Sequence, residues 1–247
     1  MKHIGLVGNS AEGAALCYRT VIEEGLSKLG GFNHPEVTLH TFSLQDYMQY
    51  LEGDRRDWEL AGEKLIESVE KLKAVGADFA LCPDNTIHHG VDIVRDRIPL
   101  PYLHICEVVA REAASRGYER LLITGTRFTM RGTIYQRALK EFGIECVMPD
   151  DEEIDELDRI IWDDLLTGQI VPTSLAYYKE VIDRYKQEGC QAVVLGCTEI
   201  PLLVTAENSP LPILDSTRLL AHEALRLAVE DELPGAAAVD ALTSVRA

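Results

Sequence analysis

A regular alternation of short apolar runs with longer helical segments most constrains the fold of this 247-residue chain. The strand-like runs are Ile4–Val7, Glu36–His40, Phe79–Leu81, Tyr102–His104, Leu121–Thr124, Val193–Leu195 and Ile213–Leu214. Helices are predicted at Ala11–Leu29, Asp57–Val75, Cys106–Arg116, Thr133–Glu141, Asp151–Leu166, Leu175–Glu188 and Thr217–Val229. Strands separated by helices form parallel sheets flanked by helices, and ligands bind at the carboxyl ends of such strands. The predicted class is therefore α/β.

Two strand-to-loop units in the chain have the same layout. Ala77–Cys82 is a short apolar run that opens into the polar loop Pro83–His89. Ala192–Leu195 likewise ends in the turn Gly196–Glu199. This repetition predicts a pseudo-symmetric molecule with a facing pair of reactive groups.

Cys197 stands where the second of these strands gives way to its turn. The thiolate is the reactive form of cysteine, and backbone N–H groups or a nearby cation bring the thiol pKa from about 8.5 toward neutrality. Gly196 lets the chain turn, and Thr198 can cap the next helical turn. The alternative is a small buried cysteine at the end of a core strand. The polar neighbours Thr198 and Glu199 favour a chemical role.

Several motifs of this chain occur together, and in the same order, in one enzyme family. The matching stretches are Ile4–Gly8, Asn85–Thr86, Gly125–Met130, the Gly-Cys-Thr-Glu sequence of 196–199, and Leu214–Thr217. In these stretches the chain resembles the aspartate/glutamate racemases, which work without pyridoxal phosphate, and the resemblance runs from Ile4 to about Ala224. It implies two pseudo-symmetric α/β lobes, each a mostly parallel sheet flanked by helices, with the active site in the cleft between them.

The resemblance also implies where the lobes begin and end. We expect the first lobe at residues 1–100, completed by a C-terminal helix at about 215–230, and the second at 101–214. Residues 231–247, which include Pro234–Ala238, are expected to form a loosely held tail.

The chain departs from the family at the first reactive position. The residue immediately before the Asn-Thr pair is usually cysteine, whereas here it is Asp84, and Cys82 lies two positions earlier. Residues two apart on an extended strand point the same way, so Cys82 could lie one layer beneath Asp84. We predict Asp84 as the second catalytic group and keep Cys82 as the alternative.

The chemistry explains why two groups are needed. Inverting a stereocentre without a cofactor requires a base on one face of Cα and an acid on the other, and hydrogen-bond donors must hold the substrate carboxylate as charge builds there. By resemblance, Cys197 and Asp84 are the catalytic pair, and Asn85, Thr86 and Thr198 hold the substrate. An aspartate of pKa about 3.9 becomes a useful base only if desolvation raises that pKa.

Other candidate substrate contacts are also implied by the resemblance. Ser10 matches a family serine, although a simple helix N-cap explains it equally well. Gln49 matches a family glutamine, and Thr126 and Thr129 could contact substrate from the second lobe, unless Thr129 only caps the next helix. His88 is interpreted as a loop-fixing residue. Family members acting on acidic amino acids carry a lysine in the segment where this chain has Gln169.

Composition excludes several other classes of function. A formal charge of −17 argues against nucleic acid as a partner, because phosphate binding needs a basic face. No glycine-rich phosphate loop follows a strand, and the six cysteines show no metal-ligand spacing, so neither cofactor nor metal is expected. No apolar run reaches the roughly 20 residues of a membrane span, and Met1–His3 leads directly into a strand. We expect a cytoplasmic protein without a signal peptide and, by analogy, a homodimer.

The leading hypothesis is a cofactor-independent amino-acid racemase of the aspartate/glutamate type, acting on a small amino acid or carboxylic acid. Two alternatives from other classes remain. One is a lyase or cis-trans isomerase that uses a single thiol on a small dicarboxylate, which Asp84 in place of cysteine favours. The other is a catalytically silent protein that binds a small acid.

Overall fold

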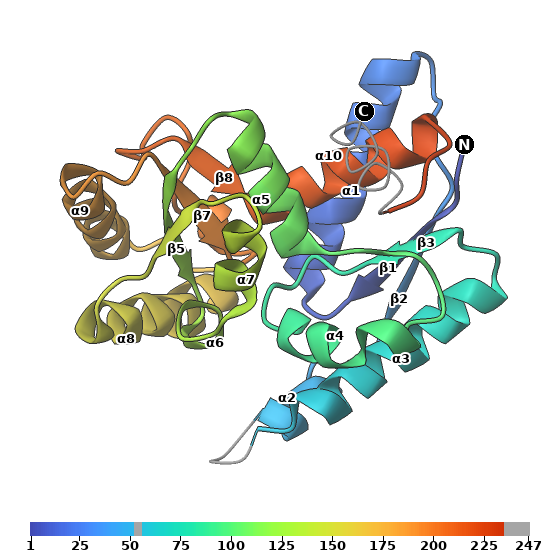
Figure 1. Cartoon of the computed structure of the whole chain (residues 1–247), viewed down its shortest axis with the longest axis horizontal. Coiled ribbons are helices and arrows are strands. Elements are labelled where there is room, and N and C mark those ends of the chain that lie inside the picture. Colours follow the sequence, from blue (N-terminus) through green and yellow to red (C-terminus); the bar gives the residue numbers. More distant parts are fainter. Residues whose placement is uncertain (52–55, 235–247) are drawn as a thin grey trace, which may run out of the picture. The chain divides into compact units, whose positions relative to one another are not determined.

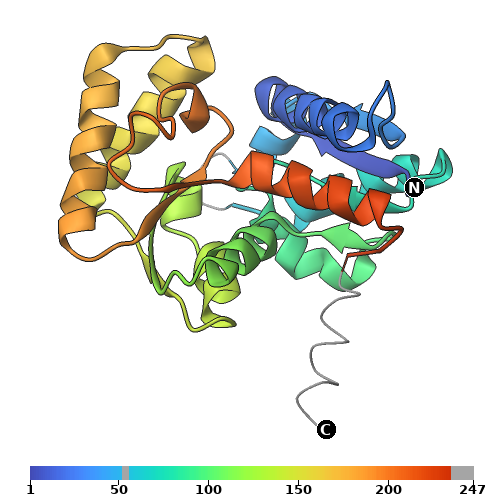
Figure 2. The same ribbon diagram turned by 90° about the horizontal axis from the view of Figure 1, so that it is seen from above.

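The computed structural model describes residues 1–51 and 56–234, shown as ribbons in Figures 1 and 2. The chain divides into two compact units. Of the described residues, the first contains 1–51, 56–83, 90–105 and 220–234, and the second contains Asp84–His89 and Cys106–Leu219. The short segment Asp84–His89 therefore belongs to the second unit, although both of its neighbours along the chain belong to the first. Of the expected tail at 231–247, the part from residue 235 lies outside the described residues.

Each unit contains a four-stranded sheet in which every pair of neighbouring strands is parallel. In the first, the order is β2-β1-β3-β4, with β1 at Ile4–Gly8, β2 at Val37–Thr41, β3 at Phe79–Leu81 and β4 at Tyr102–Leu103. In the second, it is β6-β5-β7-β8, with β5 at Arg120–Gly125, β6 at Glu145–Val147, β7 at Ala192–Gly196 and β8 at Ile213–Asp215. The two orders are the same, so β7 is the counterpart of β3. The predicted α/β class with parallel sheets is confirmed.

Helices flank the first sheet on both faces. Figure 1 shows α1 and α10 on one face of this sheet and α3 on the other. Parallel strands joined by right-handed crossovers require this arrangement, because β1 leads outward to β2 and the chain then returns past β1 to β3. The helical elements are α1 (Ala11–Leu29), α2 (Gln45–Leu51), α3 (Trp58–Ala74), α4 (His88–Val94), η1 (Arg95–Arg97) and α10 (Ser216–Val229).

The second sheet packs one face against a core built mainly from α8 and α9 and the turns beside them. Leu122 of β5 and Val193 and Leu195 of β7 are fully buried in this core. The helical elements of this half of the chain are α5 (Ile105–Ser115), α6 (Arg127–Met130), α7 (Ile134–Lys140), α8 (Asp151–Arg159), η2 (Ile160–Asp164), η3 (Leu165–Thr167), α9 (Pro172–Gln187) and η4 (Ile200–Leu202).

The ends of α8 and α9 are set by local sequence. Asp150 accepts from the Glu153 N–H, and the Glu153 side chain accepts from the Asp150 N–H, which closes a capping box at the start of α8. Pro172 stands in the first turn of α9, where its missing N–H costs nothing. An acidic run such as 150–156 ordinarily forms a solvated face, and Asp151 and Asp155 are exposed. Glu153 is the exception, because its buried carboxylate accepts from Tyr185 and pairs with Arg184.

The seven predicted strands are present, with shifts of a residue or two at their ends. Four short elements were not predicted, because each has at most seven residues and little periodicity: β6, α2, α4 and α6. The helix predicted over Asp151–Leu166 is wrong in its second half, because regular α-helix ends at Arg159 and a wider π-type turn follows. In the part of the chain that the structure describes, every helix is too short or too polar to cross a membrane.

Candidate active site

The carboxyl ends of β5 and β7 meet at a pair of glycines. Gly125 and Gly196 are partners in the parallel register. A Cβ on Gly196 would lie 2.6 Å from the Thr124 carbonyl oxygen, and one on Gly125 would lie 2.8 Å from the Gly196 carbonyl oxygen. Only glycine fits at either position, because nothing in the backbone there can yield. The pair brings the turn after β5 close to the turn that carries Cys197.

The segment Asp84–His89 is fixed to the second unit by its own side chains. His88 is fully buried, and its Nδ1–H donates to the Asp84 carbonyl oxygen at 2.8 Å. His89 Nε2–H donates to the Phe128 carbonyl oxygen at 2.9 Å, and the Thr86 and Thr126 hydroxyl oxygens lie 3.0 Å apart. The contact made by His88 supports its interpretation as a loop-fixing residue.

Asn85 is held by a buried chain of hydrogen bonds. Tyr135 donates its hydroxyl to Asn85 Oδ1 at 2.6 Å, Asn85 Nδ2 donates to Ser216 Oγ at 3.0 Å, and Ser216 donates to the Leu195 carbonyl oxygen at 2.8 Å. Burial raises the pKa of Tyr135 well above its ordinary value, which keeps the phenol a donor. The chain fixes the orientation of the Asn85 amide and commits one of its two N–H bonds.

Asp84 is a partly exposed carboxylate with a raised pKa. Its Oδ1 accepts from the Ile87 N–H at 3.0 Å and closes the turn that begins α4. The pKa of Asp84 is raised to about 6, because desolvation and the nearby Glu199 carboxylate raise it more than the hydrogen bonds from the Ile87 and Thr86 N–H groups lower it. At neutral pH Asp84 is still ionised, and it is a much stronger base than an ordinary aspartate.

Cys197 is also partly exposed, and its thiol lies beside an acidic group. Cys197 Sγ donates to Glu199 Oε2 at 2.9 Å, and the Thr198 hydroxyl donates to the same oxygen at 2.6 Å. Burial, Glu199 and Asp84 together raise the pKa of Cys197 well above the usual thiol value. The general expectation that surroundings of such a thiol lower its pKa is wrong here, because its charged neighbours are carboxylates and its sulfur is desolvated. The resting thiol is protonated.

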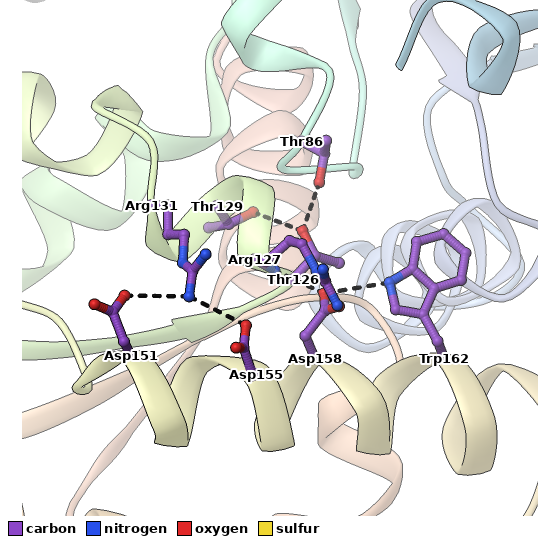
Figure 3. A network of polar contacts seen from close by, with 9 residues as sticks. All are labelled: Thr86, Thr126, Arg127, Thr129, Arg131, Asp151, Asp155, Asp158 and Trp162. Carbon is purple, nitrogen blue, oxygen red and sulfur yellow. Dashed lines mark hydrogen bonds and ion pairs between the residues drawn. The ribbon is translucent and has the colours of Figure 1, made fainter. Parts of the chain in front are cut away.

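Figure 3 shows how the turn after β5 is held. Thr126 lies at its start, with its hydroxyl oxygen 3.0 Å from that of Thr86 and 3.5 Å from that of Thr129. Asp158 projects from α8 and accepts from the Arg127 backbone N–H at 2.7 Å, from Arg127 Nε at 2.5 Å and from Trp162 Nε1 at 3.2 Å.

The structure brings most of the predicted site residues into the second unit. These are Asp84, Asn85, Thr86, Thr126, Thr129, Cys197 and Thr198. Ser10 and Gln49 belong to the first unit. Ser10 Oγ accepts from the Gly13 N–H as the N-cap of α1, and exposed Gln49 donates to the carbonyl of Asp46 on its own helix. Their contact with substrate stays a prediction.

Three polar residues that shape this candidate site were not predicted from the sequence. Tyr135 and Ser216 orient Asn85, and Asp158 holds the Thr126 turn. Ser216 lies within the matching stretch Leu214–Thr217, so a signal for it existed. Tyr135 and Asp158 gave none, because each lies inside a helix and the sequence does not show which partner its polar group meets.

The described residues contain no group of three or more histidine, cysteine, aspartate or glutamate side chains that could hold a metal ion. The chemistry that these residues support is proton transfer by a carboxylate and a thiol.

Two parallel sheets of the same strand order, with a candidate proton-transfer group after the equivalent strands β3 and β7, match the class of the Asp/Glu racemases. A sequence profile of the Asp/Glu/Hydantoin racemase family matches residues 9–224, and the chain belongs to this family.

Among solved structures, it is similar to a candidate Asp/Glu racemase from Yersinia pestis, with 32% identity, a TM-score of 0.85, and 93% of this chain and 100% of the other covered. It is also similar to an aspartate racemase homologue from Pyrococcus horikoshii OT3, with 30% identity, a TM-score of 0.80 and the same coverage. The broad specificity amino-acid racemase RacX of Bacillus subtilis (strain 168) is 25% identical over 159 residues, 64% of this chain and 67% of RacX.

Proposed function

We propose that this protein is a cofactor-independent amino-acid racemase in which Asp84 and Cys197 exchange protons with the substrate Cα from opposite faces. The proposal rests above all on the placement of the two groups, which follow equivalent strands and belong to one compact unit. Their opposite protonation states at neutral pH agree with it.

In the forward direction, ionised Asp84 removes the Cα proton and becomes a carboxylic acid. The electron pair left on Cα is delocalised into the substrate carboxylate. Cys197 then gives its thiol proton to the opposite face and becomes a thiolate. The inverted amino acid leaves, and proton exchange with water restores ionised Asp84 and the Cys197 thiol. The reverse direction requires Asp84 protonated and Cys197 ionised, which is the rarer state of the free enzyme.

Hydrogen-bond donors must stabilise the substrate carboxylate as its charge grows. The N–H of Asn85 that its buried chain leaves uncommitted is suited to this task. The hydroxyls of Thr86 and Thr126 are suited to bind the substrate carboxylate equally in the ground state and in the transition state. The Thr198 hydroxyl already donates to Glu199, so Thr198 would contact substrate through its backbone N–H or as an acceptor. Glu199 lies almost fully buried against Cys197 and orients the thiol.

The burial of the two candidates favours Asp84 over Cys82 as the second catalytic group. Asp84 is partly exposed and interacts electrostatically with both Glu199 and Cys197. Cys82 is fully buried and belongs to the first unit. A group that must touch substrate has to be reachable, which favours Asp84.

We propose aspartate, glutamate or a related amino acid as the substrate. Gln169, which replaces the family lysine, donates to the Thr167 hydroxyl at 3.1 Å and carries no charge. Loss of that cation removes a charge-assisted contact of about 1.5–3 kcal/mol with a distal carboxylate. Side chains other than those of aspartate and glutamate therefore belong in the substrate panel, as the name of the RacX relative also suggests.

The second candidate function is a lyase or cis-trans isomerase acting on a small dicarboxylate with Cys197 alone. It is favoured by Asp84, which stands where the racemases usually have their first cysteine.

Single enantiomers of a panel of amino acids, incubated in deuterated water, test the proposal. A racemase gives both enantiomers, and the inverted product carries deuterium at Cα, as chiral chromatography with mass spectrometry shows. Consumption of a dicarboxylate without Cα exchange in any amino acid would establish the second candidate. If neither reaction is observed, the protein is a catalytically silent binding protein. The Cys197→Ala variant, prepared in parallel, excludes a contaminating enzyme.

We further propose, from the family resemblance, that the protein is a homodimer. Light scattering on the purified protein measures its mass directly, and a mass of one chain would overturn this.

A further inference from the structure

We propose that Asp158 is a positioning residue that holds the Thr126 hydroxyl at the substrate site. The inference rests on the proposed function and assigns a role to a residue of α8 that lies outside the loops carrying Asp84 and Cys197. Three observations support it: the way α6 is capped, the burial of Asp158, and the partners of the Thr126 hydroxyl.

The first observation is the unusual cap of α6. Thr126 is its N-cap residue and has the extended backbone typical of one, yet its side chain makes no capping hydrogen bond. A threonine at this position ordinarily turns its hydroxyl back onto the N–H of the second or third helical residue. Here the N–H of Arg127, the first helical residue, donates to Asp158, and the N–H of Thr129 donates to the Thr126 carbonyl oxygen at 2.9 Å. The Thr126 hydroxyl is released from capping.

The second observation is that Asp158 is a fixed point. Its side chain is 1% exposed and accepts three hydrogen bonds, one from a backbone N–H, one from Arg127 Nε and one from Trp162. A buried carboxylate is tolerated only when it is satisfied in this way. Its neighbours Leu157 and Ile161 are fully buried in the core of the second unit, so the helix that presents Asp158 is anchored.

The third observation is where the released hydroxyl lies. It is 3.0 Å from the hydroxyl oxygen of Thr86, which lies two residues after Asp84 (Figure 3). Either threonine can donate to the other, and the remaining hydroxyl hydrogen can bind a substrate carboxylate. Without Asp158, the Arg127 N–H loses its acceptor and the first turn of α6 loses its attachment to α8, so the Thr126 hydroxyl is no longer held beside Thr86. The substrate would then lose a donor.

The Asp158→Asn variant perturbs this arrangement with little change in shape. The amide keeps one oxygen but directs an NH₂ group at Arg127 Nε, so two donors face each other and the turn is displaced. We expect the KM for the amino acid to rise about tenfold while kcat stays within about threefold, because a contact made equally in ground and transition states acts on KM. The matched control is Asp155→Asn, one turn earlier on α8. Asp155 is 61% exposed and bonds Arg131 at 3.1 Å, and its loss should leave KM within about twofold.

Two further variants distinguish positioning from general destabilisation. In the Asp158→Asn background, Arg127→Ala removes the side-chain donor that faces the asparagine NH₂ group. The asparagine oxygen can then accept from the backbone N–H at position 127, so KM should return toward the wild-type value. In a Thr126→Ala background, Asp158→Asn should add nothing to KM, because the hydroxyl that it positions is already absent. A general loss of stability would instead multiply the two effects and resist rescue.

Arg127→Ala alone separates positioning by Asp158 from direct substrate binding by the guanidinium, whatever the folding of the Asp158 variants. The backbone bond to Asp158 survives this change, so KM should stay within about threefold. A larger rise would overturn the inference and assign the binding to Arg127 itself. An unchanged KM in Asp158→Asn, with an active wild type, would also overturn it. No racemisation by the wild type would overturn the proposed function and this inference together.

Discussion

The loops that follow β3 and β7 occupy equivalent places in two sheets of the same strand order, yet they carry different acids. After β3 stands Asp84, a carboxylate closed into a turn by the Ile87 N–H. After β7 stands Cys197, a thiol that donates to Glu199. The fold is repeated, whereas the chemistry at the two positions is not.

The surroundings of the two groups push their pKa values in the same direction. Burial and Glu199 raise the pKa of Asp84 to about 6, and the same two causes raise that of Cys197 well above a normal thiol. Because a carboxylate starts about five pH units below a thiol, the result is opposite charge states at neutral pH. One shared electrostatic environment can therefore prepare a base and an acid together, provided that the two groups differ in intrinsic acidity.

The largest expected effect is that of Cys197→Ala. Loss of the acid should reduce racemisation by at least about 10³-fold, since no other described group takes its place. If Asp84 acts on its own face, the variant should still exchange Cα hydrogen for deuterium in one enantiomer without inverting it. Circular dichroism checks that the fold is intact. Full racemisation by this variant would remove Cys197 from the site.

Asp84→Asn should reduce racemisation by about 10²–10³-fold. The amide keeps the hydrogen bond to Ile87 but cannot accept a proton, so deuterium exchange should persist, if at all, only in the opposite enantiomer from that exchanged by Cys197→Ala.

The pH profile of the wild type tests the same group. Asp84 works as a base when ionised, so kcat/KM should rise with pH through about 6 and then level off. The rise of kcat/KM near pH 6 should be absent from Asp84→Asn. Cys82→Ala is the control. An inactive Cys82→Ala beside an active Asp84→Asn would show that Cys82 is the second group.

Glu199→Gln should separate the two groups, because it removes the carboxylate that contacts the Cys197 thiol. Removing the neighbouring negative charge lowers the pKa of Cys197, and we expect alkylation by iodoacetamide at pH 8 to be about tenfold faster. Mass spectrometry of the modified peptide locates the label, and the double variant Cys197→Ala/Glu199→Gln measures reaction at other cysteines. Unchanged alkylation would mean that desolvation alone sets the acidity of this thiol.

Much of the fold was predictable because its signals are local. Apolar runs such as Leu121–Thr124 alternate with periodic helices, and that pattern has one main solution in parallel sheets. Elements such as α6, with four residues, were not predictable, because no helical period fits so short a segment. The helix ending at Arg159 was overextended, because the turn after it is set by packing of Ile160 and Ile161 in the core.

The positions of the two proposed catalytic residues were marked by motifs, whereas their acidity was not predictable from the sequence. The positions of Asp84 and Cys197 are marked by Asn85–Thr86 and by Thr198–Glu199 in the sequence. The raised pKa of Cys197 depends on burial and on the distances to Glu199 and Asp84, which only the folded chain defines. Asp158 was hidden for the same reason, because its partner Arg127 lies 31 positions away in sequence.

The smallest expected effect, and the most direct test of chemical asymmetry, comes from restoring the family pattern with Asp84→Cys. With a pKa of about 6, Asp84 holds a proton in about one molecule in a hundred at pH 8, so the wild type is rarely ready to donate from that face. A thiol there is a fair base and a fair acid near its own pKa, and the forward and reverse turnover numbers should move closer together by about three- to tenfold.

The equilibrium constant cannot change, because enantiomers have equal free energy. Any asymmetry must therefore appear jointly in turnover number and Michaelis constant, measured in both directions by chiral chromatography. Matched turnover numbers in the wild type, or a more lopsided variant, would show that Asp84 imposes no directionality.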